Sequence, residues 1–172
     1  LNKFFFIYLP ISMATPFIST GLTFHQIFII GQKNWTLQML SQGFIFLGFF
    51  SIIGAILGGP IIDKYNTNKV VIFTLFPLLI AILTLIFFEN NFSMYLYMSL
   101  LGFNLGISIP FIGSLWAELF DLESLGTVKA LLHACSVFFS ALSPLVFGYM
   151  IDFGFGINAL CMLSLIIIIF ST

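Results

Sequence analysis

Hydrophobic residues run along the chain in long stretches instead of alternating with polar ones. Short polar connections divide them into six stretches, at residues 4–30, 37–62, 70–88, 93–117, 127–150 and 155–170. A helix needs about 20 apolar residues to span the hydrocarbon of a bilayer. The pattern therefore predicts an all-α membrane protein with six transmembrane helices, and the missing alternation argues against a membrane β-barrel.

The composition supports a lipid environment. The chain has 172 residues, of which 60% are hydrophobic and 6% are charged, whereas about a quarter of the residues of a soluble domain are charged. It has no arginine and a net charge of −1, so we expect the lipid bilayer, and no nucleic acid, as its surroundings. Cys135 and Cys161 lie inside apolar stretches, which predicts packing residues.

The lysines orient the predicted bundle. With six crossings, the N-terminus and the second and fourth connections lie on one side. That side carries Lys3, Lys64, Lys69 and Lys129, and the other carries Lys33. Because positive residues favour the cytoplasmic side, we expect both ends of this piece in the cytoplasm.

Polar residues inside the stretches gather on particular helix faces, at about 100° per residue. The first stretch carries Ser12, Thr15, Ser19, Thr23 and Gln26 on one face, the fifth carries Lys129, His133, Ser136, Ser140 and Ser143, and the fourth carries Asn104 and Ser108. Whole stripes of this kind favour a water-filled cavity, whereas single hydroxyls commonly form hydrogen bonds between helices. The third and sixth stretches lack a stripe, which indicates lipid-facing support.

Two predicted helix ends share a motif. Gly59 to Asp63 and Gly148 to Asp152 both read Gly-x-x-Ile-Asp. Three crossings separate them, so they lie on opposite faces of the membrane. This is the arrangement of a 3+3 inverted repeat, which is common in secondary transporters.

The connection after the second stretch resembles the loop that follows the second helix of each half in the major facilitator superfamily. The pattern is Gly-x-x-x-Asp-(Arg/Lys)-x-Gly-x-(Arg/Lys)-(Arg/Lys). It is matched by Gly59, Asp63, Lys64 and Lys69, whereas Asn66 and Asn68 depart from it. Residues 115–152 are similar to the tenth-to-eleventh helix region of the family. There Glu118 and Gly126 match, and Leu125 stands where arginine is usual.

The resemblance covers the whole chain and fits best the C-terminal half, helices seven to twelve. It implies half of a 12-helix transporter in the bacterial inner membrane, a fragment whose N-terminal six-helix half is missing. The function implied is secondary active transport of a small solute by alternating access. Residues 20–26 and the tenth-to-eleventh helix region look most like monocarboxylate and oxalate/formate carriers, which suggests an organic anion and proton coupling.

A gate is also implied. Asp63 lies at the C-terminal end of its own predicted helix, where the helix dipole disfavours an acid. The family resemblance implies that Asp63 instead meets the N-terminal end of the fifth helix, near Gly126, and latches the cytoplasmic side. Lys64 and Lys69 would add a charge pair to Glu118 or Glu123. Separately, Gly54, Gly58 and Gly59 would let the second helix approach a neighbour closely.

The resemblance also implies where the solute binds, because the first and fourth helices of each half line the pathway and the second and fifth flank it. The candidates for solute binding are Gln26, His25, Asn104, Ser108, His133 and Ser136. For each of these side chains the alternative is an interhelical hydrogen bond. His25 and His133 are the side chains here that suit proton coupling.

Other classes of function lack their signals in the sequence. No serine-protease turn, phosphate-binding loop or group of metal ligands at suitable spacing is present. We therefore expect no enzyme activity, no cofactor and no metal. The remaining alternative is a non-transporting polytopic membrane protein, an assembly partner or sensor with the same fold.

Overall fold

The computed structural model describes the chain except residues 1–2, 66 and 68–70, so the predicted loop residues Asn66, Asn68 and Lys69 lie outside the described part. The described residues form helices and no strand, which confirms the all-α prediction. In chain order the elements are α1 (Lys3–Phe24), α2 (Gln26–Lys33), α3 (Leu37–Lys64), the 3₁₀ helix η1 (Val71–Leu75), α5 (Phe76–Phe87), α6 (Asn91–Leu119), α7 (Leu122–Asp152) and α8 (Ile157–Ser171).

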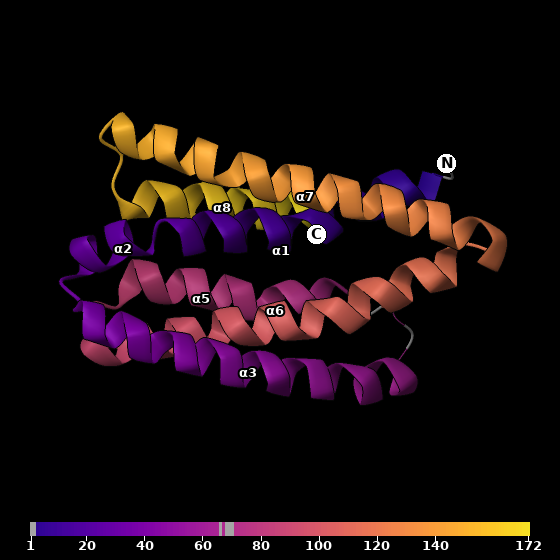
Figure 1. Cartoon of the computed structure of the whole chain (residues 1–172), viewed down its shortest axis with the longest axis horizontal. Helices are drawn as coiled ribbons and strands as arrows, with labels where there is room; N and C mark the ends of the chain where they lie inside the picture. The colour runs from indigo at the N-terminus through magenta and orange to yellow at the C-terminus, as the bar shows by residue number, and fades with distance from the viewer. Residues whose placement is uncertain (1–2, 66, 68–70) are drawn as a thin grey trace.

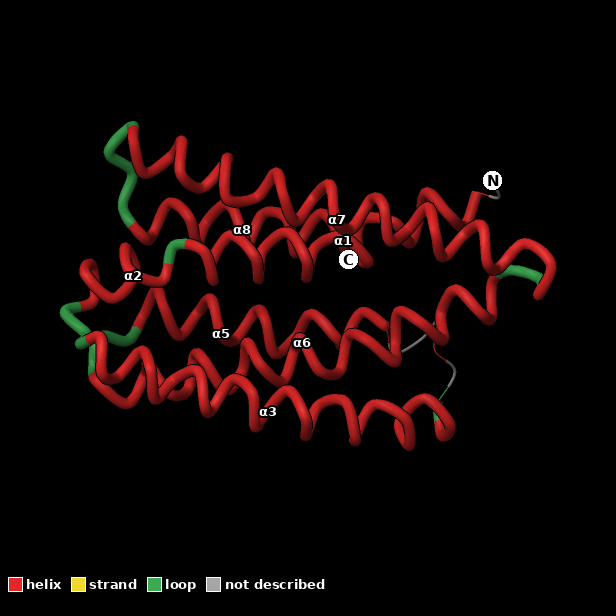
Figure 2. Tube along the Cα trace, in the orientation of Figure 1, coloured by secondary structure: helices red, strands yellow, loops and turns green. Residues whose placement is uncertain are grey.

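Four helices of the described part are long and apolar enough to cross a membrane. They are Phe5–Phe24, Leu37–Lys64, Asn91–Leu119 and Leu122–Asp152. The apolar helices Val71–Phe87 and Ile157–Ser171 are shorter. The α2–α3, α5–α6 and α7–α8 connections lie at one end of the bundle, and the α6–α7 connection lies at the other end (Figure 2).

The first apolar stretch does not form the single helix that was expected over residues 4–30. The backbone leaves helical geometry at His25, with φ −101° and ψ 24°. The backbone N–H of His25 lies 3.3 Å from the carbonyl oxygen of Gly21, and its Nδ1 lies 2.9 Å from the same oxygen. The Gly21 carbonyl oxygen thus contacts both the backbone N–H and the ring of His25, and the main-chain hydrogen bond is long. The regular helix ends there, and α2 begins at Gln26.

Side-chain caps fix where two of the longer helices, α3 and α6, begin. Thr36 accepts a hydrogen bond of 3.2 Å from the backbone N–H of Met39 at the start of α3. Asn90 accepts one of 2.8 Å from the N–H of Ser93 at the start of α6. Such caps satisfy N–H groups that the first turn of a helix leaves unpaired. Pro77 lies in the first turn of α5, where its missing N–H removes no hydrogen bond.

The helices pair in a definite order. α3 packs mainly on α6, and α1 packs mainly on α7. α5 contacts both α6 and α8. Figure 1 shows α3 along one edge of the bundle and α7 along the opposite edge, with α1, α5, α6 and α8 between them. Each of the two helices at the edges therefore packs mainly on one other helix.

Glycines allow α3 and α6 to approach backbone to backbone. A Cβ atom added to Gly102 or Gly106 of α6 would collide with the main chain of Leu47 or Ser51, and one added to Gly54 would lie 2.5 Å from the carbonyl oxygen of Phe103. Small residues at such crossings are typical of membrane bundles. The expected close approach at Gly58 is also present, against Pro110.

Gly59 does not contribute to this crossing, contrary to expectation. A Cβ added there would meet nothing within 4 Å. Gly59 follows Gly58 directly, so it points about 100° away from the face that contacts α6.

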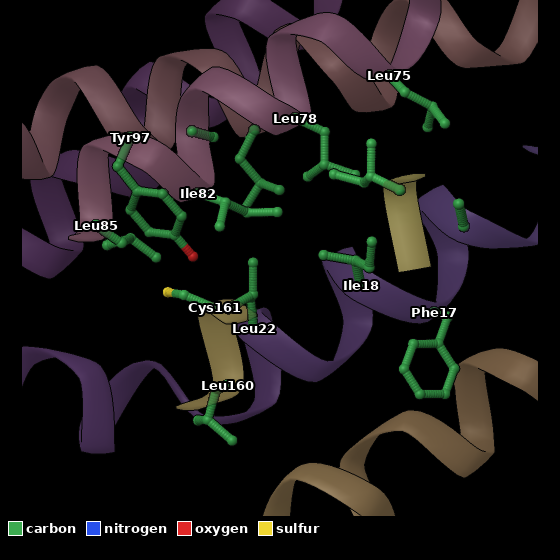
Figure 3. Packing of buried hydrophobic residues seen from close by; sticks show 14 of the residues in the cluster. Phe17, Ile18, Leu22, Leu75, Leu78, Ile82, Leu85, Tyr97, Leu160 and Cys161 are labelled. Atoms are coloured by element: carbon green, nitrogen blue, oxygen red, sulfur yellow. The ribbon is translucent and has the colours of Figure 1, made fainter. Parts of the chain in front are cut away.

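The buried core lies between α1, α5, α6 and α8 (Figure 3). Leu78, Ile82 and Leu85 of α5 and Leu160 of α8 are fully buried there. Cys161 is buried in the same cluster, and both it and Cys135 are free thiols, as expected for packing residues. The stripe-free helices α5 and α8 thus each give one face to the core, while side chains such as Phe170 are exposed.

Candidate functional site

A cavity of about 300 Å³ lies where α1, α6 and α7 meet. It is lined by Ser12, Met13, Ile112, Gly113, Trp116, Lys129, Leu132, His133 and Ser136. Polar side chains of the α1 and α7 stripes therefore meet in one cavity, as a stripe-lined pathway requires. By contrast, the cavity beside Leu9, Phe139 and Ile167 is lined almost entirely by apolar side chains.

Helix geometry places the α7 residues of this cavity. Lys129, His133 and Ser136 stand four and three residues apart, so they share one face of α7. Lys129 and His133 are exposed and Ser136 is half-buried. Leu132, on the side of this face, is buried. Two predicted solute-binding residues, His133 and Ser136, therefore lie together in the cavity, beside Lys129.

Trp116 closes part of the cavity from the α6 side. Its indole is 1% exposed, and its ring packs against Phe5 at a centroid distance of 5.4 Å and against Phe120 at 5.9 Å. The indole N–H has no hydrogen-bond acceptor among the described residues. A buried donor of this kind normally finds a partner. The apolar stretch around Trp116 gave no sign of this role.

The hydroxyls of α1 divide between the cavity and the helix contacts. Ser12 lines the cavity and donates a hydrogen bond of 2.9 Å to the carbonyl oxygen of Tyr8. Thr15 lies 3.5 Å from the hydroxyl of Ser108 on α6, and Thr20 lies 2.8 Å from that of Ser140 on α7. The predicted solute-binding residue Ser108 therefore takes part in an interhelical contact and does not line the cavity.

Gln26 and His25 lie at the break between α1 and α2, outside this cavity. Gln26 is 4% exposed and donates a hydrogen bond of 2.7 Å from Nε2 to the hydroxyl of Tyr97 on α6. Its Oε1 has no partner among the described residues. The imidazole of His25 lies 6.1 Å from the ring of Phe147 on α7. The structure does not bring either residue together with His133.

Asn104 is directed away from the cavity, toward η1. Its side chain is fully buried, and Nδ2 donates a hydrogen bond of 2.7 Å to the carbonyl oxygen of Thr74. Oδ1 has no partner among the described residues. This contact ties α6 to the start of the third apolar segment, as an interhelical hydrogen bond does.

The structure does not bring Asp63 and Gly126 together as the expected latch requires. A Cβ at Gly126 would meet nothing within 4 Å, and Asp63 is exposed. Two features explain this. α3 pairs with α6 whereas α7 pairs with α1, and α7 begins at Leu122, after its N-cap residue Asp121. The free N–H groups of α7 therefore precede Gly126.

The other predicted gating residues have different neighbours from those expected. The Lys64 ammonium lies 5.3 Å from the centre of the Tyr65 ring. Glu118 accepts a short hydrogen bond from the hydroxyl of Thr67, which also lies 3.0 Å from the hydroxyl of Ser114. Thr67 thus ties the connection after α3 to the end of α6. Thr67 occupies a variable position of the loop pattern, so that pattern does not indicate its role.

In the part of the chain that the structure describes, no three His, Cys, Asp or Glu side chains gather to hold a metal ion. The side chains that line the cavity instead carry an ammonium, an imidazole and hydroxyls. Groups of this kind can hold a polar molecule by charge and hydrogen bonds.

Comparison with known proteins agrees with this picture. The sequence profile of the Major Facilitator Superfamily matches residues 4–172. No curated protein sequence matches the chain.

Proposed function

Because the chain belongs to the Major Facilitator Superfamily, we propose that it carries a small solute across a membrane by alternating access. The family consists of secondary transporters and not of enzymes, and its members are integral membrane proteins. The apolar helices of this chain agree with that setting. The membrane proposed is the bacterial inner membrane, with both ends of the chain in the cytoplasm, on the basis of the lysine distribution.

The observation that carries this proposal is the polar cavity between α1, α6 and α7. Lys129, His133 and Ser136 of α7 converge on it with Ser12 of α1. Both Lys129 and His133 belong to the long apolar helix α7, and ionisable side chains in such helices mark solute or ion pathways.

A second six-helix half is part of the proposal, with this chain as the C-terminal half. In the apolar 18-residue segment of each long helix, 11% of the residues of α3 and 17% of those of α7 are buried in the bundle. The corresponding shares are 61% for α1 and 50% for α6. A second half packed on α3 and α7 accounts for their exposure. The pairing of helices supports a 3+3 repeat. In such a repeat α1, α3 and α5 correspond to α6, α7 and α8, so the α3–α6 pair corresponds to the α7–α1 pair, and both pairs pack together.

The solute proposed is an organic anion such as a monocarboxylate, with proton coupling. Lys129 gives the cavity a positive charge. Imidazole is the side chain that changes charge near neutral pH, and His133 is the histidine that lines this cavity. The proposed gating residues remain Gly59, Asp63, Lys64, Lys69, Glu118 and Gly126. Because Asp63 and Gly126 are not in contact in this structure, we propose that these residues change partners during the transport cycle.

Uptake by proteoliposomes tests the proposal. The protein, reconstituted together with its second half, is expected to accumulate a labelled monocarboxylate saturably, and faster with the interior alkaline. This chain alone is expected to insert without transporting. Saturable uptake by the chain alone would contradict the need for a second half. No uptake of any organic anion by the complete assembly would favour a non-transporting membrane protein with the same fold.

A further inference from the structure

The short helix α2 buries its polar side chains and exposes an apolar one. Its buried residues are Gln26, Ile29, Ile30 and Lys33, whereas Ile27 is 65% exposed. The buried face therefore carries an amide at one end and an ammonium at the other. Burying such groups costs free energy unless hydrogen bonds compensate for the lost water. The packed position of α2 is thus opposed by the hydration of its own side chains.

The two polar ends of this face are attached to the bundle but incompletely paired. The Gln26 amide donates to the Tyr97 hydroxyl, while its Oε1 has no partner among the described residues. A lysine ammonium can donate three hydrogen bonds. Among the described residues, that of Lys33 donates one, of 3.2 Å, to the carbonyl oxygen of Phe88 at the end of α5. The C-terminal end of a helix attracts a cation, so this contact holds α2 in place while part of the ammonium stays unpaired.

His25 gives α2 a hinge. The backbone leaves helical geometry at this residue, and the His25 side chain does not cap the start of α2. Its ring Nδ1 instead lies 2.9 Å from the Gly21 carbonyl oxygen, which the His25 N–H contacts at 3.3 Å. Sharp bends in helices usually come from proline, glycine or an inserted side chain. Here a side chain is inserted, so a continuous helix through residue 25 requires only the loss of the ring contact.

α2 covers the end of the core that contains Tyr97 and Cys161. Figure 3 shows the Tyr97 hydroxyl directed toward the Cys161 sulfur, and both side chains are 0% exposed. Gln26 reaches the same hydroxyl from α2. The helices that α2 mainly contacts are α1 and α3, its neighbours in sequence. Lifting α2 would therefore break few contacts with α5, α6 and α8.

From these contacts we infer that α2 is a lid, hinged at His25, which opens and closes over Tyr97 and Cys161 while the longer helices keep their packing. The structure shows the closed form, in which Gln26 and Lys33 hold the lid. In the open form water hydrates both side chains. The use of the lid as a gate rests on the proposed transport function, whereas its movement does not.

Cys161 reports the movement, because a thiol buried under a closed lid reacts only when the lid opens. The purified chain with Cys135→Ala is labelled with N-ethylmaleimide in lipid nanodiscs, and mass spectrometry follows the rate. Ser164→Cys in a Cys161→Ala background controls for general unfolding, since Ser164 is also 0% exposed and lies one turn farther along α8. Cys161 is expected to react at least about tenfold faster than the thiol introduced at position 164, because local opening needs less free energy than global unfolding.

Two glutamines of α2 form a matched pair for the lid contact. Gln26→Ala leaves the buried Tyr97 hydroxyl without this partner, so we expect labelling of Cys161 to become at least about tenfold faster. Gln32 is exposed, and Gln32→Ala is expected to keep the rate within about twofold of that of the unmodified residue.

A second pair tests the hinge. His25→Leu removes the ring contact with the Gly21 carbonyl and favours a continuous helix, so we expect severalfold faster labelling of Cys161. Phe24→Leu changes the exposed residue before it and is expected to leave the rate unchanged. If these variants fail to fold, hydrogen exchange of the unmodified chain tests the lid. The amides of α2 are then expected to exchange at least about tenfold faster than those of α5.

Three results would overturn the inference: labelling of Cys161 no faster than at position 164, equal labelling in Gln26→Ala and Gln32→Ala, or exchange in α2 as slow as in α5. Equal labelling in His25→Leu and Phe24→Leu would overturn the hinge.

Uptake by the complete assembly is measured separately. Faster labelling in Gln26→Ala with unchanged uptake would refute the use of the lid as a gate and keep both the lid and the transport function. Labelling as expected without any uptake by the unmodified assembly would refute the transport function and keep the lid.

Discussion

The side-chain amide of Gln26 donates a hydrogen bond of 2.7 Å to the hydroxyl of Tyr97. Gln26 is the first residue of α2, directly after the break at His25, and Tyr97 lies on α6. Both side chains are buried. This hydrogen bond therefore fixes α2 against the bundle after the first apolar stretch has lost its helical continuity.

Tyr97→Phe is expected to destabilise the protein by about 1–3 kcal/mol, because it leaves the buried Gln26 amide without its acceptor. The thermal unfolding midpoint in detergent measures this. Tyr95→Phe is the matched control. Tyr95 lies two residues earlier on α6, is only half-buried, and donates a hydrogen bond of 2.7 Å to Gln42. If both variants lower the thermal unfolding midpoint equally, the hydrogen bond to Gln26 does not stabilise the protein more than the exposed one to Gln42 does.

The α3–α6 crossing gives a second prediction. Gly106→Ala is expected to lower the thermal midpoint by several degrees, because the new methyl group would collide with the main chain at Ser51. Gly48→Ala on α3 is the control, since a Cβ there meets nothing within 4 Å. In that position alanine is expected to be neutral or stabilising, because glycine is a poor helix former. If Gly106→Ala is as stable as Gly48→Ala, the two helices do not cross this closely.

Topology is testable at two exposed acids. Glu89 and Glu123 are both exposed in the structure, on the connection before α6 and in the first turn of α7. From the lysine asymmetry we expect Glu123→Cys to react with an impermeant thiol reagent from the cytoplasmic side and Glu89→Cys from outside. The background carries Cys135→Ala and Cys161→Ala. Labelling of both positions from one face would contradict an odd number of crossings between them.

Asn104 and His133 were grouped as solute ligands from sequence, and the structure suggests opposite outcomes for them. Asn104→Ala removes a buried hydrogen bond to Thr74, so we expect lower protein abundance with little change in solute affinity. His133→Ala alters a cavity-lining side chain that is exposed, so we expect normal abundance and at least a severalfold weaker apparent affinity. The opposite pattern would place the solute beside Asn104.

The all-helical character was predictable because hydropathy depends only on the order of residues along the chain. It did not predict the break at His25, which depends on a side chain that shares the carbonyl of Gly21 with the backbone. It also placed the start of the fifth helix at residue 127, whereas α7 begins at Leu122. The extra residues 122–126 read LESLG, and their mixed polarity left them outside the apolar stretch.

The candidate site was predictable in part for a related reason. Lys129, His133 and Ser136 share a face through their spacing alone, and the cavity does contain all three. Whether a helix face lines a cavity or contacts a neighbouring helix depends on which helices pack together. The spacing of residues along one helix does not determine this. Ser108 and Asn104 were therefore grouped with the cavity although they contact Thr15 and Thr74.

The last prediction concerns Asp63, which lies in the final turn of α3 and is exposed. An acid is unfavourable at the C-terminal end of its own helix, by about 0.3–1 kcal/mol. Asp63→Asn is therefore expected to leave the thermal midpoint unchanged or slightly raised. If Asp63 changes partners when the cytoplasmic side closes, the same variant should slow uptake by the complete assembly about tenfold, since roughly 1.4 kcal/mol shifts a two-state equilibrium by that factor.

Asp152 supplies the control, because it occupies the same place in the second Gly-x-x-Ile-Asp motif, at the end of α7. It is exposed as well, so Asp152→Asn relieves the same helix-dipole penalty. The C-terminal ends of α3 and α7 lie at opposite ends of the bundle (Figure 1), so we expect Asp152 on the other face of the membrane. We expect its thermal midpoint to follow that of Asp63→Asn while uptake stays within about twofold of the unmodified protein. Uptake lost equally in both variants would indicate a general effect of these helix ends, and unchanged uptake in Asp63→Asn would remove Asp63 from the gate.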